Sequence, residues 1–168
     1  DIPNFPLADS ADRRFMAMPA YLGGRFHMCG EKWYGSNGRN SHKGLPRSIL
    51  IATLNDVETG QPLAYMSANL LSAMRTGAMP GLTAMYLARK DSRVLTILGA
   101  GVIGRTSLMA IMAKFPDLEV LKIKGSSKTS HTAHELADYA RENYKSLKEI
   151  IICDTLEEAV RDADIIAE

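Results

Sequence analysis

The stretch that decides the fold is residues 94–104, which read VLTILGAGVIG. An apolar run rich in β-branched residues enters a turn with closely spaced glycines, and an apolar pattern of helical spacing follows. A strand, a G-x-G-x-x-G turn and a helix in this order form the pattern that binds the pyrophosphate of a dinucleotide. Gly99 permits the tight turn, Gly101 lets the backbone approach the phosphates, and Gly104 lets the helix pack closely on the strand.

The start of the following helix completes this candidate site. Its first N–H groups have no partner inside the helix, and the positive end of the helix dipole favours an anion. We therefore assign cofactor binding to Gly99, Gly101, Val102, Ile103 and Gly104. The alternative is a glycine-rich turn without a ligand.

Composition and charge exclude several classes of protein. The chain has 168 residues, 46% of them hydrophobic and 23% charged, which is typical of a globular protein with a buried core. A formal net charge of +1 gives no reason to expect a nucleic acid or an anionic membrane surface as partner. No apolar run approaches the ~20 residues of a membrane span. Cys29 and Cys153 lie far apart without a CxxC pair, which favours a reducing, cytoplasmic compartment.

The sequence beyond the glycine turn alternates between helical and strand patterns. We predict helices at 102–115, 132–143 and 156–162, and strands at 119–124, 148–153 and 164–167. Thr132-x-x-Glu135 and Thr155-x-x-Glu158 have the spacing of capping boxes that open the second and third helices. This order predicts an α/β fold, with residues 91–168 forming the first half of a Rossmann-type doubly wound parallel sheet. Because that fold needs a second half, we expect the chain to be a fragment of a longer protein.

Residues 1–90 have a different pattern. We predict strands at 18–24, 31–35, 47–55 and 61–67, a hairpin turn at 56–60 and a helix at 69–89. Pro80 lies inside that helix and should kink or restart it. The polar segment 35–44 is predicted to be a surface loop. Its basic residues, with Arg47, form either a solvated surface or an anion-binding rim.

Five motifs occur in order along the chain: MPAYLGG, GEKWYGSNGRNSHKGLPRS, LNDVETGQPLA, SAMRTGA and LGAGVIG. Together they resemble the ornithine cyclodeaminase/mu-crystallin family of NAD(P)-binding proteins, over residues 16–168. The resemblance implies that residues 1–90 form part of a smaller α/β domain that binds substrate and dimerises. In that family the Rossmann domain is inserted into this smaller domain. Because the smaller domain of the family dimerises, we expect a homodimer.

The resemblance also implies an activity. Members of the family transfer hydride between the α-carbon of a small amino acid and nicotinamide, through an imine. We expect an NAD(P)-dependent amino-acid dehydrogenase or ketimine reductase that acts on a small amino-acid or imino-acid substrate. The alternatives are an ornithine cyclodeaminase, which is an ammonia-releasing lyase, an amino-acid-condensing synthase of siderophore assembly, and a non-catalytic NADPH-binding crystallin-like protein.

Two residues carry over from the family as catalytic candidates. Lys32 in EKWYG aligns with the lysine that contacts the substrate carboxylate and handles protons, and its neighbours Trp33 and Tyr34 could desolvate its amine. Arg75 in MRTGA aligns with the arginine that clamps the substrate carboxylate, for which its planar fork is suited. We expect both side chains to face one cleft. The alternatives are a lysine at a strand edge and a structural ion pair on the helix.

Other ligand patterns are weaker. The family's upstream arginine, a second carboxylate ligand, should fall near residues 5–9, where there is none, and Arg14 is the nearest substitute. The aspartate used by the cyclising members falls beyond this chain. His131 and His134 are three residues apart without a third ligand, so no metal site is expected.

The end of the second predicted strand indicates which dinucleotide is used. NAD-specific sites usually place Asp or Glu about 20 residues beyond the glycines, where it bonds the ribose 2′-hydroxyl. Lys124 occupies that position here, and Ser126, Ser127 and Lys128 follow it. These four side chains can donate hydrogen bonds and positive charge to a 2′-phosphate. We therefore predict a preference for NADP(H), with NAD(H) as the alternative.

Overall fold

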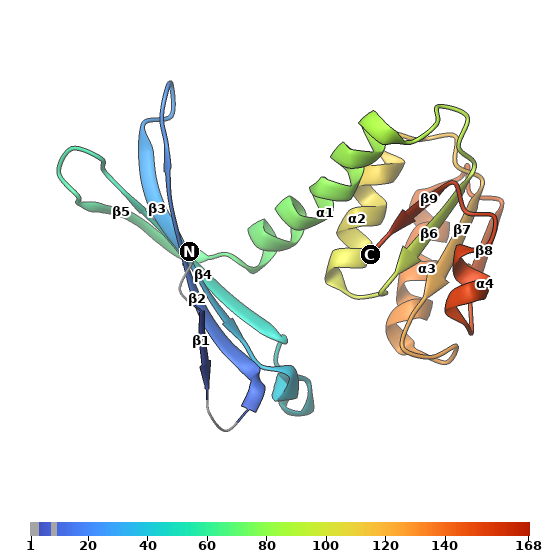
Figure 1. Ribbon diagram of the computed structural model, residues 1–168, viewed down its shortest axis with the longest axis horizontal. Coiled ribbons are helices and arrows are strands. Elements are labelled where there is room, and N and C mark those ends of the chain that lie inside the picture. Colours follow the sequence, from blue (N-terminus) through green and yellow to red (C-terminus); the bar gives the residue numbers. More distant parts are fainter. Residues whose placement is uncertain (1–3, 8–9) are drawn as a thin grey trace. The chain divides into compact units, whose positions relative to one another are not determined.

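The computed structural model describes the backbone of residues 4–7 and 10–168 and the side chains from Arg13 onward (Figure 1). The chain divides into two compact units, Asp1–Ser72 and Ala73–Glu168. The division falls inside helix α1 (Asn69–Leu87), whereas the sequence pattern placed it at residue 90. Most of α1 therefore belongs to the second unit.

The first unit contains an antiparallel sheet in the order β1-β2-β3-β4-β5. The strands are β1 (Asn4–Leu7), β2 (Ser10–Leu22), β3 (Met28–Ser36), β4 (Ser48–Asn55) and β5 (Pro62–Ser67). The predicted hairpin of β4 and β5 is confirmed. Asp56 fixes its turn, because its carboxylate accepts hydrogen bonds from the N–H groups of Glu58 and Thr59 at 3.1 and 2.8 Å. The strands predicted near residues 18 and 31 belong to the longer β2 and β3, which pair as one antiparallel ladder.

The segment between β3 and β4, predicted as a surface loop, is largely exposed but folded. It forms the 3-10 helix η1 (Gly38–Lys43), whose start is capped by the Asn37 side chain, which accepts a hydrogen bond from Arg39 N at 3.0 Å. Gly44 ends it with a φ of 67°, a left-handed conformation that glycine adopts without strain. The Asn40 side chain donates to the carbonyl of Pro46 at 2.9 Å and ties the segment together.

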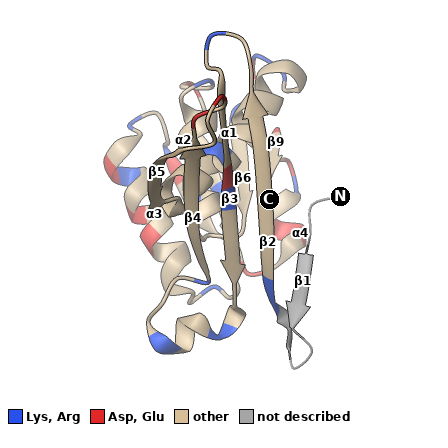
Figure 2. Ribbon diagram, turned by 90° about the vertical axis from the view of Figure 1, so that its left-hand side faces the viewer, with Lys and Arg blue, Asp and Glu red and all other residues tan. Residues whose placement is uncertain are grey.

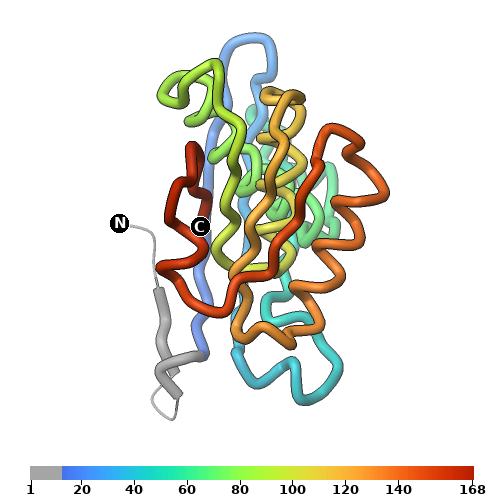
Figure 3. The backbone as a smooth tube through the Cα atoms, turned by 90° about the vertical axis from the view of Figure 1, so that its right-hand side faces the viewer, coloured from blue at the N-terminus to red at the C-terminus, as the bar shows by residue number. Residues whose placement is uncertain are grey.

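The second unit contains a parallel sheet in the order β8-β7-β6-β9. In chain order its elements after α1 are β6 (Val94–Leu98), α2 (Val102–Met112), β7 (Val120–Lys124), α3 (His131–Asn143), β8 (Glu149–Ile152), α4 (Leu156–Val160) and β9 (Ile165–Ala167). The chain runs outward from β6 through β7 to β8 and then crosses to β9 on the other side of β6 (Figure 3). This is the 3-2-1-4 order of a Rossmann sheet, so the predicted fold class is confirmed. The order reverses between β6 and β9, the switch point at which such sheets bind ligands.

The core of the second unit lies between the sheet and its helices. Strand side chains Leu95, Ile97, Leu121 and Ile123 and helix side chains Leu108, Ile111 and Leu136 are at most 2% exposed. Burial of apolar surface stabilises a fold by roughly 25 cal/mol per Å². The sheet that carries the glycine turn is therefore held by a continuous apolar core.

The two predicted capping boxes have different outcomes. The Thr155 side chain accepts a hydrogen bond from Glu158 N at 3.1 Å, and the Glu158 carboxylate accepts one from Thr155 N, so the box that opens α4 is confirmed. The box at Thr132 is wrong, because α3 starts at His131 with Ser130 as its N-cap. A hydrogen bond from Ser130 N to the Ser127 carbonyl, at 3.1 Å, already turns the chain before Thr132.

Helix α1 packs on α2 through a stripe of small residues. The buried residues of α1 are Ala73, Gly77, Gly81 and Ala84. A side chain at Gly77 would overlap Thr106 of α2, and the Thr106 hydroxyl donates to the Ala73 carbonyl at 3.0 Å. This stripe continues on both sides of Pro80. A restart of the helix at Pro80 is excluded, because α1 is one helix from Asn69 to Leu87 (Figure 1).

Asp164 joins the beginnings of β6 and β9. Its carboxylate accepts hydrogen bonds from the backbone N–H groups of Arg93 and Val94, at 2.7 and 2.9 Å, and from the Arg89 guanidinium. The two backbone bonds and the Arg89 charge hold the pKa of Asp164 below its ordinary value. The ionised carboxylate is therefore part of the fold.

We expect Asp164→Asn to lower the free energy of unfolding by about 1 to 3 kcal/mol at pH 7, because a charged acceptor is lost. The folded-state pKa is lowered, so the carboxylate stabilises the fold fully above its ordinary pKa of about 3.9. This contribution is lost as the pH falls through the lowered pKa, and the difference between the wild type and the variant should shrink there. Urea unfolding at a series of pH values measures it. Asp162→Asn, an exposed position with a φ of 56° that Asn tolerates, is the matched control. Equal stability of the two variants at pH 7 would contradict the assignment.

Candidate functional site

The glycine turn between β6 and α2 uses its three glycines in three different ways. Gly99 has a φ of 97°, which side chains rarely allow. A side chain at Gly104 would overlap the carbonyl oxygen of Gly99, so α2 can approach the turn only without one. Gly101 has an ordinary φ of −83°, and a Cβ there would meet no atom within 4 Å. Gly101 therefore opens onto free space, where a ligand can reach the backbone.

The first turn of α2 faces that space with unpaired backbone donors. Gly101 is the N-cap, and no side chain among the described residues caps it. The first turn carries no acidic residue, and Val102 and Ile103 are 69% and 38% exposed. Because the first N–H groups of a helix lack partners within it, this terminus suits an anionic group such as a phosphate.

The end of β7 lies directly beside the glycine turn. Gly99 N donates to the Lys124 carbonyl at 2.8 Å, and Lys124 ends the strand that pairs with β6. The Lys124 amine donates to the Gly125 carbonyl at 2.6 Å. Ser126, Ser127 and Lys128 follow in an exposed segment that leads to α3. The structure thus brings the predicted 2′-phosphate residues to the same end of the sheet as the glycine turn.

Lys32 lies in β3, between β2 and β4, and is half-buried. Its amine donates to the Ser72 hydroxyl at 3.2 Å. A position on an inner strand excludes the alternative of a lysine at a strand edge. Trp33 does not desolvate it as expected, because successive strand residues point to opposite faces, and Trp33 stacks on Phe15 at 5.9 Å between ring centroids. The bond to Ser72 could not be predicted, because it joins residues far apart in the sequence.

Tyr34 shares the sheet face of Lys32 and is held by several groups. Its hydroxyl accepts a hydrogen bond from Ser48 Oγ at 2.8 Å, and the Arg14 guanidinium carbon lies 5.6 Å from its ring centroid. Burial acts to raise the pKa of Tyr34, but hydrogen bonds with Ser36, Ser48 and Arg14 and the Arg14 charge bring it below its ordinary value. The sequence signal was present in the alternation of positions 32, 34 and 36.

Arg75 lies on α1 in the second unit and is exposed. It forms no hydrogen bond or ion pair within the part of the chain that the structure describes, so the alternative of a structural ion pair has no partner there. Lys32 belongs to the first unit, and the convergence of the two side chains on one carboxylate stays a prediction. The position of the upstream arginine, near residues 5–9, lies outside the residues whose side chains are described.

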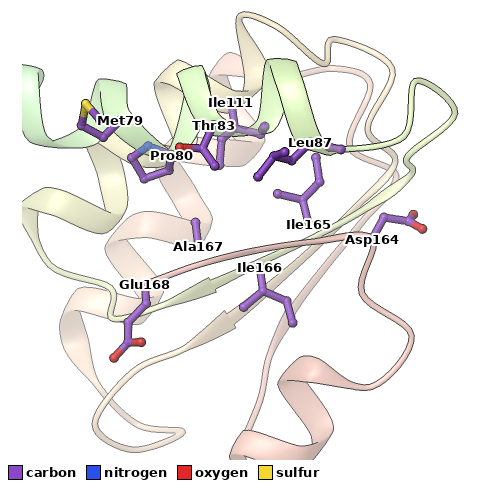
Figure 4. Close-up of a pocket in the computed structure, with 12 residues that line it drawn as sticks. Met79, Pro80, Thr83, Leu87, Ile111, Asp164, Ile165, Ile166, Ala167 and Glu168 are labelled. Carbon is purple, nitrogen blue, oxygen red and sulfur yellow. The ribbon is translucent and has the colours of Figure 1, made fainter.

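A groove of about 440 Å³ in the second unit lies between α1 and β9 (Figure 4). Ile165 and Ala167 of β9 point toward Pro80 and Leu87 of α1, whereas Ile166 points away. The lining is mostly apolar, and none of the predicted site residues lines it. The groove is therefore separate from the candidate site.

The described residues offer no cluster of metal ligands. They contain no group of three or more His, Cys, Asp or Glu side chains that could hold a metal ion. His131 is instead paired with Glu135, with Nδ1 3.3 Å from the carboxylate. In the same part of the chain, no helix has both the length and the apolar character needed to cross a membrane.

Comparison with known proteins identifies the family. The model of the ornithine cyclodeaminase/mu-crystallin family matches residues 2–168. The chain belongs to this family. The resemblance found in the sequence motifs is thereby confirmed over nearly the whole chain.

Two curated relatives illustrate the likeness in sequence. The chain is 39% identical over 120 residues to N-((2S)-2-amino-2-carboxyethyl)-L-glutamate dehydrogenase of Staphylococcus aureus, covering 71% of this chain and 34% of that protein. It is 43% identical over 104 residues to alanine dehydrogenase of Archaeoglobus fulgidus, covering 62% and 31%. The chain thus spans about a third of the length of the curated relatives it matches.

Two solved structures are similar to this chain in fold. The Delta(1)-pyrroline-2-carboxylate reductase of Thermococcus litoralis, in complex with NADH and L-proline, matches with a TM-score of 0.87 and 31% identity, over 98% of this chain and 49% of that one. A dimeric archaeal alanine dehydrogenase with bound NAD matches with a TM-score of 0.77 and 32% identity, over 95% and 47%.

We expect Gly101→Ala and Gly104→Ala to separate ligand binding from folding. A methyl group at Gly101 meets no protein atom, so stability should change by less than about 0.5 kcal/mol, while dinucleotide affinity falls about tenfold or more. A methyl group at Gly104 overlaps the Gly99 carbonyl and should destabilise the fold by about 1 to 3 kcal/mol. Calorimetric titration and urea unfolding measure the two effects. Unchanged affinity in Gly101→Ala would show that the ligand does not approach the backbone there.

Proposed function

We propose that this chain belongs to an NAD(P)-dependent enzyme that transfers hydride between the α-carbon of a small amino acid and nicotinamide, through an imine. The main support is the open backbone at Gly101 beside the uncapped start of α2, at the switch point of a Rossmann sheet. Relatives named as dehydrogenases and reductases of amino and imino acids agree with it, and two neighbouring structures hold NADH or NAD.

The reaction divides the work between the cofactor and the chain. A bound nicotinamide would accept the hydride from the α-carbon or return it to the imine. The chain has to hold the substrate carboxylate and manage the proton of the substrate nitrogen. The Lys32 amine, fixed by the Ser72 hydroxyl, can bind the carboxylate and exchange a proton. The exposed fork of Arg75 can bind a carboxylate with two parallel hydrogen bonds.

A panel of amino and keto acids, given to the whole protein with NAD(H) or NADP(H), tests the activity. Net change in the absorbance of the reduced cofactor supports a dehydrogenase or reductase. Ammonia release without net change would assign a cyclodeaminase or a condensing synthase instead. Tight cofactor binding with no turnover would assign the binding protein.

Lys32→Met and Arg75→Met should each lower kcat/KM by an amount equivalent to about 2 to 5 kcal/mol, because each removes a charge that holds the carboxylate. If both hold the same carboxylate, the double variant should lose less than the sum of the two, by at least about 1 kcal/mol. Lys90→Met, at an exposed lysine of the second unit, is the control and should leave kcat/KM unchanged. Strict additivity would contradict a shared carboxylate.

We further propose that the preferred cofactor is NADP(H). Residues 120–134 contain no acidic side chain, and Lys124 ends the strand where an NAD site usually carries one. Ser126, Ser127 and Lys128 lie exposed in the segment that follows. These side chains supply donors and positive charge for a 2′-phosphate.

Dissociation constants of NADPH and NADH for the whole protein measure this preference. NADPH should bind more tightly, and Lys128→Gln should weaken NADPH about tenfold while leaving NADH unchanged, because only NADPH carries the phosphate. Lys145→Gln, at another exposed lysine of the second unit, should change neither. Equal or tighter binding of NADH by the wild type would contradict the proposal.

The first unit also suits the homodimer expected for the family. One face of its sheet carries Phe15, Ile49 and Tyr65, which are 39%, 49% and 72% exposed, around the stacked Trp33. Exposed apolar patches of this kind mark interaction surfaces. We propose this face as the contact with a second copy.

A further inference from the structure

We propose that Arg14 and Tyr34 form a second anion-binding position, which takes a carboxylate on the side chain of the substrate. This inference rests on the proposed function, in which Lys32 receives the α-carboxylate. It narrows the substrate class to amino acids with two carboxylates, or to the corresponding imino or keto acids.

The register of the sheet places Arg14 and Tyr34 on the same face as Lys32. Positions 32, 34 and 36 of β3 alternate along the strand and therefore share one face. Arg14 of β2 lies directly opposite Ser36, so it belongs to that face. Lys32 and Ser36 are four positions apart on β3, so their Cα atoms lie about 13 Å apart at ~3.3 Å per residue. Because Arg14 lies opposite Ser36, the long side chains of Lys32 and Arg14 can bring their charged ends closer together than this. One substrate molecule can therefore contact both cations.

Arg14 packs against Tyr34 but has no carboxylate partner among the described residues. Its guanidinium carbon lies 5.6 Å from the centroid of the Tyr34 ring, and the Tyr34 hydroxyl accepts a hydrogen bond from Ser48 Oγ at 2.8 Å. Arg14 is exposed, and no carboxylate of the described residues pairs with it. A guanidinium has five N–H donors, so packing against the Tyr34 ring leaves a pair of them for a carboxylate.

The surroundings of this position favour negative charge. Residues 32–55 contain no Asp or Glu, and the adjoining segment carries Arg39, Lys43 and Arg47 (Figure 2). Asn37 and Gly44 cap this segment at both ends, so its charges stay at this end of the sheet. The donors around the Tyr34 oxygen hold its pKa below the ordinary value, which indicates that they stabilise an anion at this point. The proposed position adjoins the segment whose basic residues were considered as an anion-binding rim.

The test compares charged substrates with their neutral isosteres in the whole protein. We expect kcat/KM for L-glutamate or L-aspartate to exceed that for L-glutamine or L-asparagine. In Arg14→Gln this ratio should fall about 10- to 100-fold, because a charge-assisted bond is lost. In Tyr34→Phe, which keeps the ring but not the hydroxyl, it should fall about fivefold. Arg14→Lys, which keeps the charge without the fork, should lie between the wild type and Arg14→Gln.

Arg25→Gln is the matched control. Arg25 is also exposed and also packs over an aromatic ring, that of Phe26 at 4.7 Å, but it lies in the turn at the other end of β3. Its removal should leave the ratio unchanged. Thermal unfolding of each variant shows whether the fold is retained.

Calorimetric titration with glutarate, which has two carboxylates, and with butyrate, which has one, separates the second anion-binding position from the proposed enzymatic function. The second position is overturned if the protein turns over substrate but Arg14→Gln leaves the ratio of kcat/KM for charged and neutral substrates unchanged. It is also overturned if the wild type has the higher kcat/KM for the neutral isosteres. Arg14-dependent binding of glutarate without any turnover supports the position and overturns the proposed function. Glutarate binding that is absent, or independent of Arg14, overturns the position even if no substrate is turned over.

Discussion

The close approach of α2 to the carbonyl of Gly99 is the constraint on which the second unit depends. It requires the absence of a side chain at Gly104, and it sets where the helix begins. The same turn is bonded through Gly99 N to the Lys124 carbonyl, so β6, α2 and β7 meet at one point. The exposed donors of α2 and the end of β7 are placed together as a result. If the contact between Gly104 and the Gly99 carbonyl were loosened, both the start of α2 and the end of β7 would shift within the candidate nucleotide site.

A second contact of the same kind fixes α1. Gly77 leaves room for Thr106, whose hydroxyl reaches the backbone of α1 at Ala73. Arg75 lies between these two buried positions and is exposed. The short motif MRTGA thus combines a residue available to a ligand with a glycine that the packing requires. Small residues, rather than large apolar ones, define the surface on which α1 rests.

Local patterns made much of this fold predictable. The strand, glycine turn and helix were correct because each residue acts on its immediate neighbours, and the capping box at Thr155 was correct for the same reason. The box at Thr132 failed because the turn at Ser127 starts the helix earlier. Pro80 did not end α1 and start a new helix, since packing along α2 supports the helix on both sides. Asp164, Ser72 and the pair of Arg14 and Tyr34 depend on partners far along the chain, which periodicity does not reveal.

Helix α1 has a consequence for how this protein can be taken apart. The division between the two compact units falls between Ser72 and Ala73, within a helix that continues to Leu87. A chimera joined at that point would cut a hydrogen-bonded helix and separate Ala73 from the turn before it. The units are therefore not interchangeable modules in the usual sense, despite their distinct sheets. A chimera that exchanges the sheet of either unit has to keep α1 intact. It also has to keep the residues of α2 on which the small residues of α1 pack.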